Sequence, residues 1–116
     1  MSITIYGIKN CSTMKKAFDW LQARGIEHRF HDYKREGIDS TTLRRWCAAL
    51  GWKTLVNTRG TTWRTLTPAE QAIAGDADAI ALMQRYPSLV KRPVLERDDL
   101  LLVGFSADAW AKSFPD

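Results

Sequence analysis

Residues 3–21, ITIYGIKNCSTMKKAFDWL, decide the fold, because in this stretch a strand pattern passes directly into a helical one. The run Ile3–Tyr6 is rich in β-branched and aromatic residues, which favour strands. A helical stripe follows at spacings of three and four residues, formed by Met14, Ala17, Phe18 and Leu21. Cys11 lies at the junction, where the predicted helix begins.

A cysteine at the start of a helix is placed to react as a thiolate. The first turn of a helix offers unpaired backbone N–H groups and the positive end of the helix dipole, and both favour the ionised sulfur. A buried structural cysteine is the alternative, but the neighbours Asn10, Ser12 and Thr13 are polar. We therefore predict that Cys11 is a nucleophile and that the protein is a cysteine redox protein.

Working outward, the opening segment predicts a strand, a helix and a second strand. The helix is expected over about Ser12–Arg24, with Gly25 ending it, and the second strand over about His28–His31. Such a unit implies two parallel neighbouring strands joined by a right-handed crossover.

Residues from about 37 to 90 carry helical signals only. Asp39 or Ser40 is expected to cap a first helix that Gly51 ends, and its apolar stripe is Leu43, Trp46, Cys47 and Leu50. Thr67-Pro68-Ala69-Glu70 is a capping box that opens a second helix, which we expect to end at Gly75. Asp76 is expected to cap a third, which Pro87 stops.

Strand character returns near the C-terminus. Pro93-Val94-Leu95, a turn at Arg97-Asp98-Asp99 and Leu100–Val103 predict an antiparallel hairpin, and a short helix follows from Ser106 and buries Trp110 and Phe114. The order predicts an α/β, thioredoxin-like core (βαβ … ββα, mixed sheet) with a helical insertion between its halves. We expect a single domain over 1–116, with the core at about 1–35 and 88–116 and the insertion at about 37–87.

Composition limits which binding partners and which cellular compartment we expect for this protein. The 116 residues carry a net charge of +4, but the basic pairs are scattered, so we do not expect nucleic-acid binding. No apolar run approaches the roughly 20 residues that cross a bilayer, and a strand that begins next to Met1 leaves no room for a secretory signal. The lack of such a signal predicts a cytoplasmic protein. Two cysteines are too few for a disulfide scaffold and lack the spacing of a zinc site, so we expect reduced thiols, no metal and no bound cofactor.

Three separated segments resemble one protein family. They are Ile5-Tyr6-Gly7-Ile8-Lys9-Asn10-Cys11-Ser12-Thr13, Leu55-Val56-Asn57-Thr58-Arg59-Gly60, and Tyr86–Pro93 followed by Leu102-Val103-Gly104-Phe105. In this order they resemble the arsenate reductase (ArsC)/Spx family over nearly the whole chain. The run from Asn57 to Arg64 is most similar to that of the small YffB-type members, which have a single active-site cysteine.

The resemblance implies roles for individual residues. Cys11 matches the nucleophile of the family, Arg92 matches the arginine before its proline, and Pro93 matches the proline that thioredoxin-like proteins hold in cis beside the cysteine. Arg59 lies in a loop where the family places another anion-binding arginine. A direct alignment with the arsenate reductases, however, puts Asn57 at the position of that arginine.

Two departures from the family pattern bear on the activity. Arsenate reductases have a histidine four residues before the cysteine and a third arginine late in the chain, where this sequence has Gly7 and Phe105. These departures argue against efficient arsenate reduction. Spx regulators have a Cys-x-x-Cys pair, whereas Met14 stands three residues after Cys11, so an intrahelical disulfide switch cannot form.

We expect a monothiol oxidoreductase that uses glutathione or another small thiol as co-substrate and reduces small-molecule or protein disulfides. The carboxylates of glutathione would be attracted by Lys9, Arg92 and Arg59. A cis Arg92–Pro93 bond would expose backbone groups that can pair with the extended backbone of this tripeptide. Asn10, Ser12 and Thr13 complete the predicted binding site. Cys47 is expected in the core, with a resolving thiol as the alternative. Two alternative functions remain, an arsenate reductase that uses Cys11 and an Spx-like regulator that binds RNA polymerase.

Overall fold

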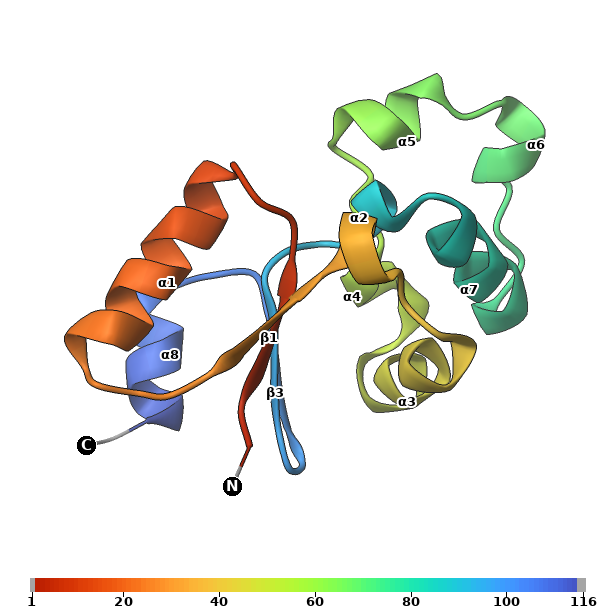
Figure 1. The fold of residues 1–116 in the computed structure, drawn as a ribbon. Coiled ribbons are helices and arrows are strands. Elements are labelled where there is room, and N and C mark those ends of the chain that lie inside the picture. The colour runs from red at the N-terminus through yellow and green to blue at the C-terminus, as the bar shows by residue number, and fades with distance from the viewer. Residues whose placement is uncertain (1, 115–116) are drawn as a thin grey trace. The chain divides into compact units, whose positions relative to one another are not determined.

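The computed structural model describes residues 2–114 and divides them into two compact units (Figure 1). The first, which we call the sheet unit, takes the chain through Asp32 and again from Arg92 onward. The second, the helical unit, is Tyr33–Lys91. Residues from both halves of the sheet unit, far apart in the sequence, therefore share one compact unit, and the residues between them form the other.

The sheet unit is built on four strands in the order β2-β1-β3-β4. They are β1 (Thr4–Gly7), β2 (Arg29–Asp32), β3 (Val94–Arg97) and β4 (Leu100–Val103). β1 pairs with β2 in parallel and with β3 antiparallel, and β3 and β4 form an antiparallel hairpin. The predicted mixed sheet and thioredoxin-like core are confirmed, with strand ends shifted by one or two residues.

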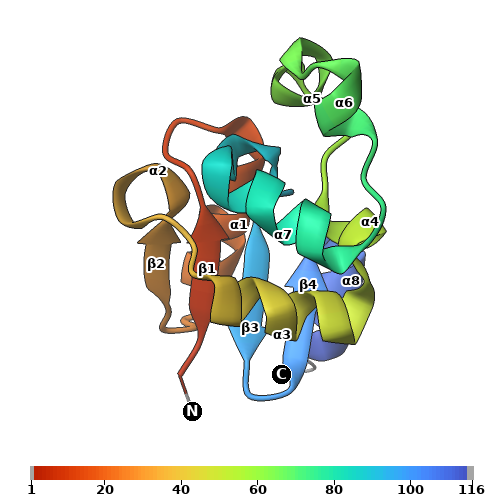
Figure 2. The ribbon, with the colours of Figure 1, turned by 90° about the vertical axis from the view of Figure 1, so that its right-hand side faces the viewer.

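Two helices cover one face of this sheet, α1 (Ser12–Ala23) and α8 (Ala107–Ser113), as Figures 1 and 2 both show. Their apolar sides and the facing strand residues share one buried core of Ile5, Met14, Ala17, Leu21, Leu95, Trp110 and Phe114. Trp20 packs edge-on against Trp110, with ring centroids 5.7 Å apart. The core fixes α1, and therefore Cys11 at its start, against the sheet.

The ends of α1 and α8 follow local signals in the sequence. Gly25 has a φ of +66°, a conformation that side chains rarely adopt, directly after the C-cap residue Arg24 of α1. The Ser106 side chain accepts a hydrogen bond of 3.3 Å from the N–H of Ala109 and caps α8. Both predictions are confirmed.

The helical unit consists of short helices around a core of its own. In chain order they are α2 (Tyr33–Glu36), α3 (Ser40–Leu50), α4 (Trp52–Leu55), α5 (Thr61–Thr65), α6 (Pro68–Gln71), α7 (Asp76–Arg85) and the 3-10 helix η1 (Pro87–Leu89). Leu43, Trp46, Leu55, Met83 and Leu89 are fully buried. A bridge between Val56 and Val90 adds a short antiparallel pairing that the sequence did not suggest.

Two predicted ends in the helical unit are wrong. The capping box at Thr67 is present, but α6 ends at Gln71 rather than at Gly75. The chain leaves the helix because the C-cap Ala72 adopts a ψ of 66°, and the N–H of Ala74 then bonds the side chain of Asp78 at 3.0 Å. Gly75 is therefore the N-cap of α7, and Asp76 is its first helical residue instead of its cap.

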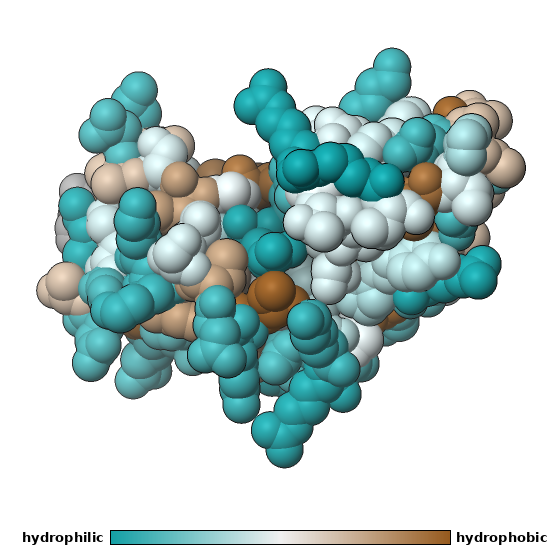
Figure 3. Space-filling model, turned by 90° about the horizontal axis from the view of Figure 1, so that it is seen from above, coloured by the Kyte–Doolittle hydropathy of each residue, from teal (hydrophilic) through white to brown (hydrophobic). Residues whose placement is uncertain are grey.

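The surface seen in Figure 3 is mostly hydrophilic to neutral, and the brown, apolar areas on that face are small. This agrees with a mean hydropathy of −0.31. None of the helices formed by residues 2–114 is long and apolar enough to cross a membrane.

Candidate active site

The loop between β1 and α1 sets the position of Cys11. β1 ends at Gly7, and Asn10 then adopts a left-handed φ of 60°. Cys11 follows in an extended conformation (φ −112°, ψ 128°) as the N-cap of α1. Its carbonyl oxygen accepts the first helical hydrogen bond, 3.0 Å from the N–H of Lys15. The predicted place of Cys11 at the strand-to-helix junction is therefore what the structure shows.

The surroundings of the Cys11 sulfur lower its pKa. Partial burial alone would raise the pKa, because it penalises the charged form. Hydrogen bonds from the N–H of Met14, the side chain of Arg92 and the N–H of Thr13, together with the positive charge of Arg92, outweigh this effect. The net pKa of Cys11 lies below that of an ordinary cysteine, so more of the thiol is ionised at neutral pH.

Arg92 reaches Cys11 because β3 lies beside β1. Tyr6 near the end of β1 pairs with Val94 at the start of β3. Arg92 precedes that strand, and its side chain hydrogen-bonds the sulfur. The Arg92–Pro93 peptide bond is cis, as the resemblance implies, and Pro93 accepts a hydrogen bond of 2.8 Å from the N–H of Gly104.

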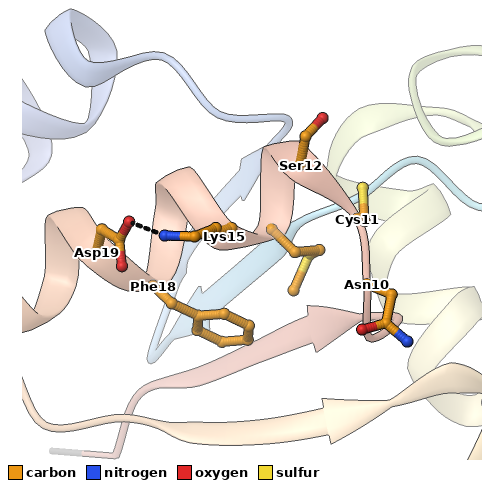
Figure 4. Close-up of a pocket in the computed structure, with 7 residues that line it drawn as sticks. Asn10, Cys11, Ser12, Lys15, Phe18 and Asp19 are labelled. Atoms are coloured by element: carbon orange, nitrogen blue, oxygen red, sulfur yellow. Dashed lines mark hydrogen bonds and ion pairs between the residues drawn. The ribbon is translucent and has the colours of Figure 1, made fainter.

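A hollow of about 540 Å³ borders the first turns of α1. Its lining residues, all drawn as sticks in Figure 4, are Asn10, Cys11, Ser12, Met14, Lys15, Phe18 and Asp19. Lys15 and Asp19 form an exposed ion pair of 3.0 Å on this helix. Lys15, Phe18 and Asp19 were not predicted as site residues, although their spacing from Cys11 of four, seven and eight residues places them on one helix face. That spacing is the signal that points to them.

The space next to Gly7 is filled by Met14. A Cβ atom on Gly7 would lie 2.6 Å from Met14 Cε and closer still to its Sδ. Met14 itself is 1% exposed and belongs to the core of the sheet unit. A larger side chain four residues before Cys11 would therefore require Met14 to move.

The other predicted site residues fall into two groups. Lys9, Ser12 and Thr13 lie in the sheet unit within two residues of Cys11; Lys9 and Ser12 are exposed, and Thr13 acts through its backbone N–H. Arg59 belongs to the helical unit, where its carbonyl oxygen accepts a bond of 2.8 Å from Arg64 and its N–H bonds Asn57 at 3.1 Å. Its part in the site stays a prediction.

Cys47 has the character of a core residue. It is 5% exposed on α3, and burial, followed by the negative charge of Asp76, raises its pKa. Both cysteines are free thiols. Residues 2–114 hold no cluster of three His, Cys, Asp or Glu side chains suited to a metal ion.

The sequence and the site match a known family. The family model described as ArsC matches residues 6–113, which is nearly the whole described chain. The chain belongs to the ArsC family. An uncharacterised protein of Haemophilus influenzae is 40% identical over 112 residues, which cover 97% of this chain and 98% of that relative.

Two further comparisons place the chain within the ArsC family. The solved structure of a YffB protein has a TM-score of 0.92 at 51% identity and covers 96% of this chain and 97% of its own. The global transcriptional regulator Spx of Enterococcus faecalis is 24% identical over 115 residues, covering 97% of this chain and 86% of its own. The family resemblance predicted from the three segments is confirmed, including the likeness to YffB-type members.

Proposed function

We propose that this ArsC-family chain is a monothiol reductase in which Cys11 attacks a disulfide and glutathione completes the cycle. The observation that carries the proposal is the placement of Cys11 at the N-cap of α1, with Arg92 hydrogen-bonded to its sulfur. This arrangement lowers the pKa of Cys11, which raises the thiolate fraction at neutral pH, and it places a cation next to the sulfur. We place the reaction in the cytoplasm, where glutathione keeps thiols reduced.

The reaction has two exchange steps. The Cys11 thiolate attacks the glutathione sulfur of a mixed disulfide, the substrate S–S bond breaks, and the substrate leaves as a thiolate that takes a proton from water. A second glutathione thiolate then attacks the Cys11–glutathione disulfide. Glutathione disulfide forms and the Cys11 thiolate is released, so that the substrate sulfur is reduced to a thiol, the incoming glutathione sulfur is oxidised, and the disulfide bond passes from the substrate to glutathione.

The need for an external thiol follows from the cysteines of this chain. Cys11 and Cys47 are its only two cysteines, and Cys47 is buried with a raised pKa. Position 14, where a resolving cysteine of a Cys-x-x-Cys pair would stand, is Met14. The carboxylates of glutathione suit the cations Arg92 and Lys9, and we include Arg59 in the proposed binding site.

Arsenate reduction is less well supported by this site. A histidine at position 7, which arsenate reductases use, would collide with Met14. The late position that would supply a third arginine holds Phe105, whose ring packs 4.9 Å from that of Trp110. We therefore do not propose arsenate reduction as a second function, and we measure it as an alternative result in the experiments below.

The test follows Cys11 in a Cys47→Ala background. We expect glutathione disulfide to form one adduct on Cys11, seen by mass spectrometry, and glutathione to release it during turnover of a mixed disulfide. The matched Cys11→Ser variant should form no adduct. Absence of the adduct, or an adduct that glutathione does not release, would overturn the proposal.

The alternative functions are measured with the same proteins. Arsenate reduction that exceeds disulfide turnover would favour the oxyanion reaction. Binding of the RNA polymerase α-subunit by Cys11→Ser as tightly as by wild type, with no thiol turnover, would favour a regulatory protein.

A further inference from the structure

We infer that Asn10 is a positioning residue whose left-handed backbone, rather than its amide group, sets Cys11 at the start of α1. Asn10 has a φ of 60°, and the next residue is the proposed nucleophile. The inference rests on the proposed function only in taking Cys11 as the reacting group.

A positive φ at a residue with a side chain needs a reason. Among residues 2–114, the non-glycine residues with positive φ are Asn10 and Asp98. Asp98 lies in the two-residue turn between β3 and β4, where such a conformation suits the twist of the strands. Asn10 lies in no hairpin. Its backbone instead turns the chain from the end of β1 into α1, and asparagine adopts this conformation more readily than most residues.

The turn at Asn10 determines which groups the Cys11 sulfur meets. After it, Cys11 is extended, and the N–H groups of Thr13 and Met14 in the first turn of α1 help to lower the pKa of the sulfur. Arg92 approaches the same atom from the start of β3. Because β1 and α1 are both held by the core of the sheet unit, a negative φ at position 10 would have to be offset by other torsions of the loop, including those of Cys11. Such a change would turn the Cys11 sulfur away from Arg92 and from the N–H groups of Thr13 and Met14, so the interactions that favour the thiolate would weaken.

The side chain of Asn10 does not share in these bonds. It is exposed, and within residues 2–114 its amide group makes no hydrogen bond. Figure 4 shows the amide pointing to the opposite side of the loop from the Cys11 sulfur. The contribution of Asn10 to the thiolate therefore lies in its backbone.

The test measures the rate of iodoacetamide alkylation of Cys11 against pH in the Cys47→Ala background. Asn10→Gly keeps the freedom to adopt a positive φ, so we expect its pH profile to match that of the parent. Asn10→Ile, which is β-branched, should lower the rate at neutral pH by roughly three- to tenfold and move the profile to higher pH. Asn10→Ala, which disfavours a positive φ less strongly, serves if the isoleucine variant does not fold.

Asp98→Ile is the matched control, since it places the same residue at another exposed position of the sheet unit with a positive φ. We expect it to lower stability while leaving the Cys11 profile unchanged. A parental profile in both Asn10→Ile and Asn10→Ala would overturn the inference, and so would an Asn10→Gly profile shifted as far as that of Asn10→Ile. Alkylation requires no substrate, so loss of the glutathione adduct in wild type would overturn the proposed function alone.

Discussion

At the scale of single residues, the reactivity of Cys11 is a balance between burial and four favourable interactions. Burial raises its pKa, whereas the N–H groups of Met14 and Thr13 and the guanidinium of Arg92 lower it. Arg92 acts twice, through a hydrogen bond and through its charge, and both act on the ionised sulfur. Its removal should therefore raise the pKa of the Cys11 thiol.

Arg92→Ala should raise the pKa of Cys11 and slow its alkylation at neutral pH. The measurement is the alkylation rate against pH in the Cys47→Ala background. Arg97→Ala is the control, because Arg97 lies in the same sheet unit but stacks 4.7 Å from the ring centroid of Phe114. Superimposable profiles for Arg92→Ala and its parent would contradict the assignment of Arg92.

The two cysteines should affect stability in opposite directions as pH rises. The folded pKa of Cys11 is lowered, so its contribution is fully present above the unfolded pKa and is lost as pH falls through the folded value. The pKa of Cys47 is raised, so its contribution is present below the unfolded pKa and is lost as pH rises through the folded value.

This difference is measured as free energy of unfolding in urea at several pH values between about 6 and 10, a range that includes the unperturbed cysteine pKa. As pH rises, the free energy of unfolding of wild type should increase relative to that of Cys11→Ser. Relative to that of Cys47→Ala, it should decrease. Parallel curves for the two variants would rule out opposite shifts.

Gly7→Ala should destabilise the protein by about 1–3 kcal/mol, because the new methyl group overlaps the Met14 side chain. Gly75→Ala is the steric control, since no atom lies within 4 Å of the added carbon there; because alanine is a poorer N-cap than glycine, we expect a loss of up to about 1 kcal/mol that Met14→Ala does not relieve. Urea unfolding measures both. Adding Met14→Ala should relieve the overlap, so the double variant is expected to lose less than the sum of the single losses.

At the scale of elements, sequence signals located most helices and strands but not the shortest ones. The ends of α1 and α3 follow from Gly25, Asp39 and Gly51, because caps and left-handed glycines act locally. The helices α2, α4 and α5 have four or five residues each, too few to form without tertiary packing, and no period marks them in the sequence. α6 is equally short, and this explains why the helix predicted from the correct capping box at Thr67 was too long.

Thr67→Ala should lower stability by about 1 kcal/mol, since it removes half of the capping box of α6. The Thr67 hydroxyl accepts a bond of 3.1 Å from the N–H of Glu70, whose carboxylate returns one of 2.9 Å to the N–H of Thr67. Thr58→Ala, at an exposed loop position, should change stability by less than about 0.5 kcal/mol. Equal unfolding midpoints for the two variants would show that the capping box contributes nothing.

At the scale of the whole molecule, the candidate site is assembled from distant parts of the sequence. Cys11 could be predicted from its junction, and Arg92 and Pro93 from the family resemblance. The role of Met14 could not, because it acts through a backbone N–H that every residue except proline has. The position of Arg92 at the sulfur depends on the pairing of β3 with β1, which no local pattern encodes.

Cys47 should report the opening of the helical unit. It is 5% exposed and has a raised pKa, so in the Cys11→Ser background we expect slow alkylation in the native protein and rapid alkylation in urea. The labelling curve should follow the loss of circular dichroism. Native-state labelling of Cys47 as fast as that of a free cysteine would show that this part of the core is open.

The pairing of Cys11 with Arg92 also bears on how the protein is made. Cys11 is synthesised well before Arg92 and β3, because the whole helical unit lies between them in the sequence. Until then the thiol lacks the hydrogen bond and the charge of Arg92, two of the interactions that lower its pKa. The nucleophile therefore gains this part of its activation only after Arg92 and β3 have been synthesised and β3 has paired with β1, which limits premature oxidation of the growing polypeptide.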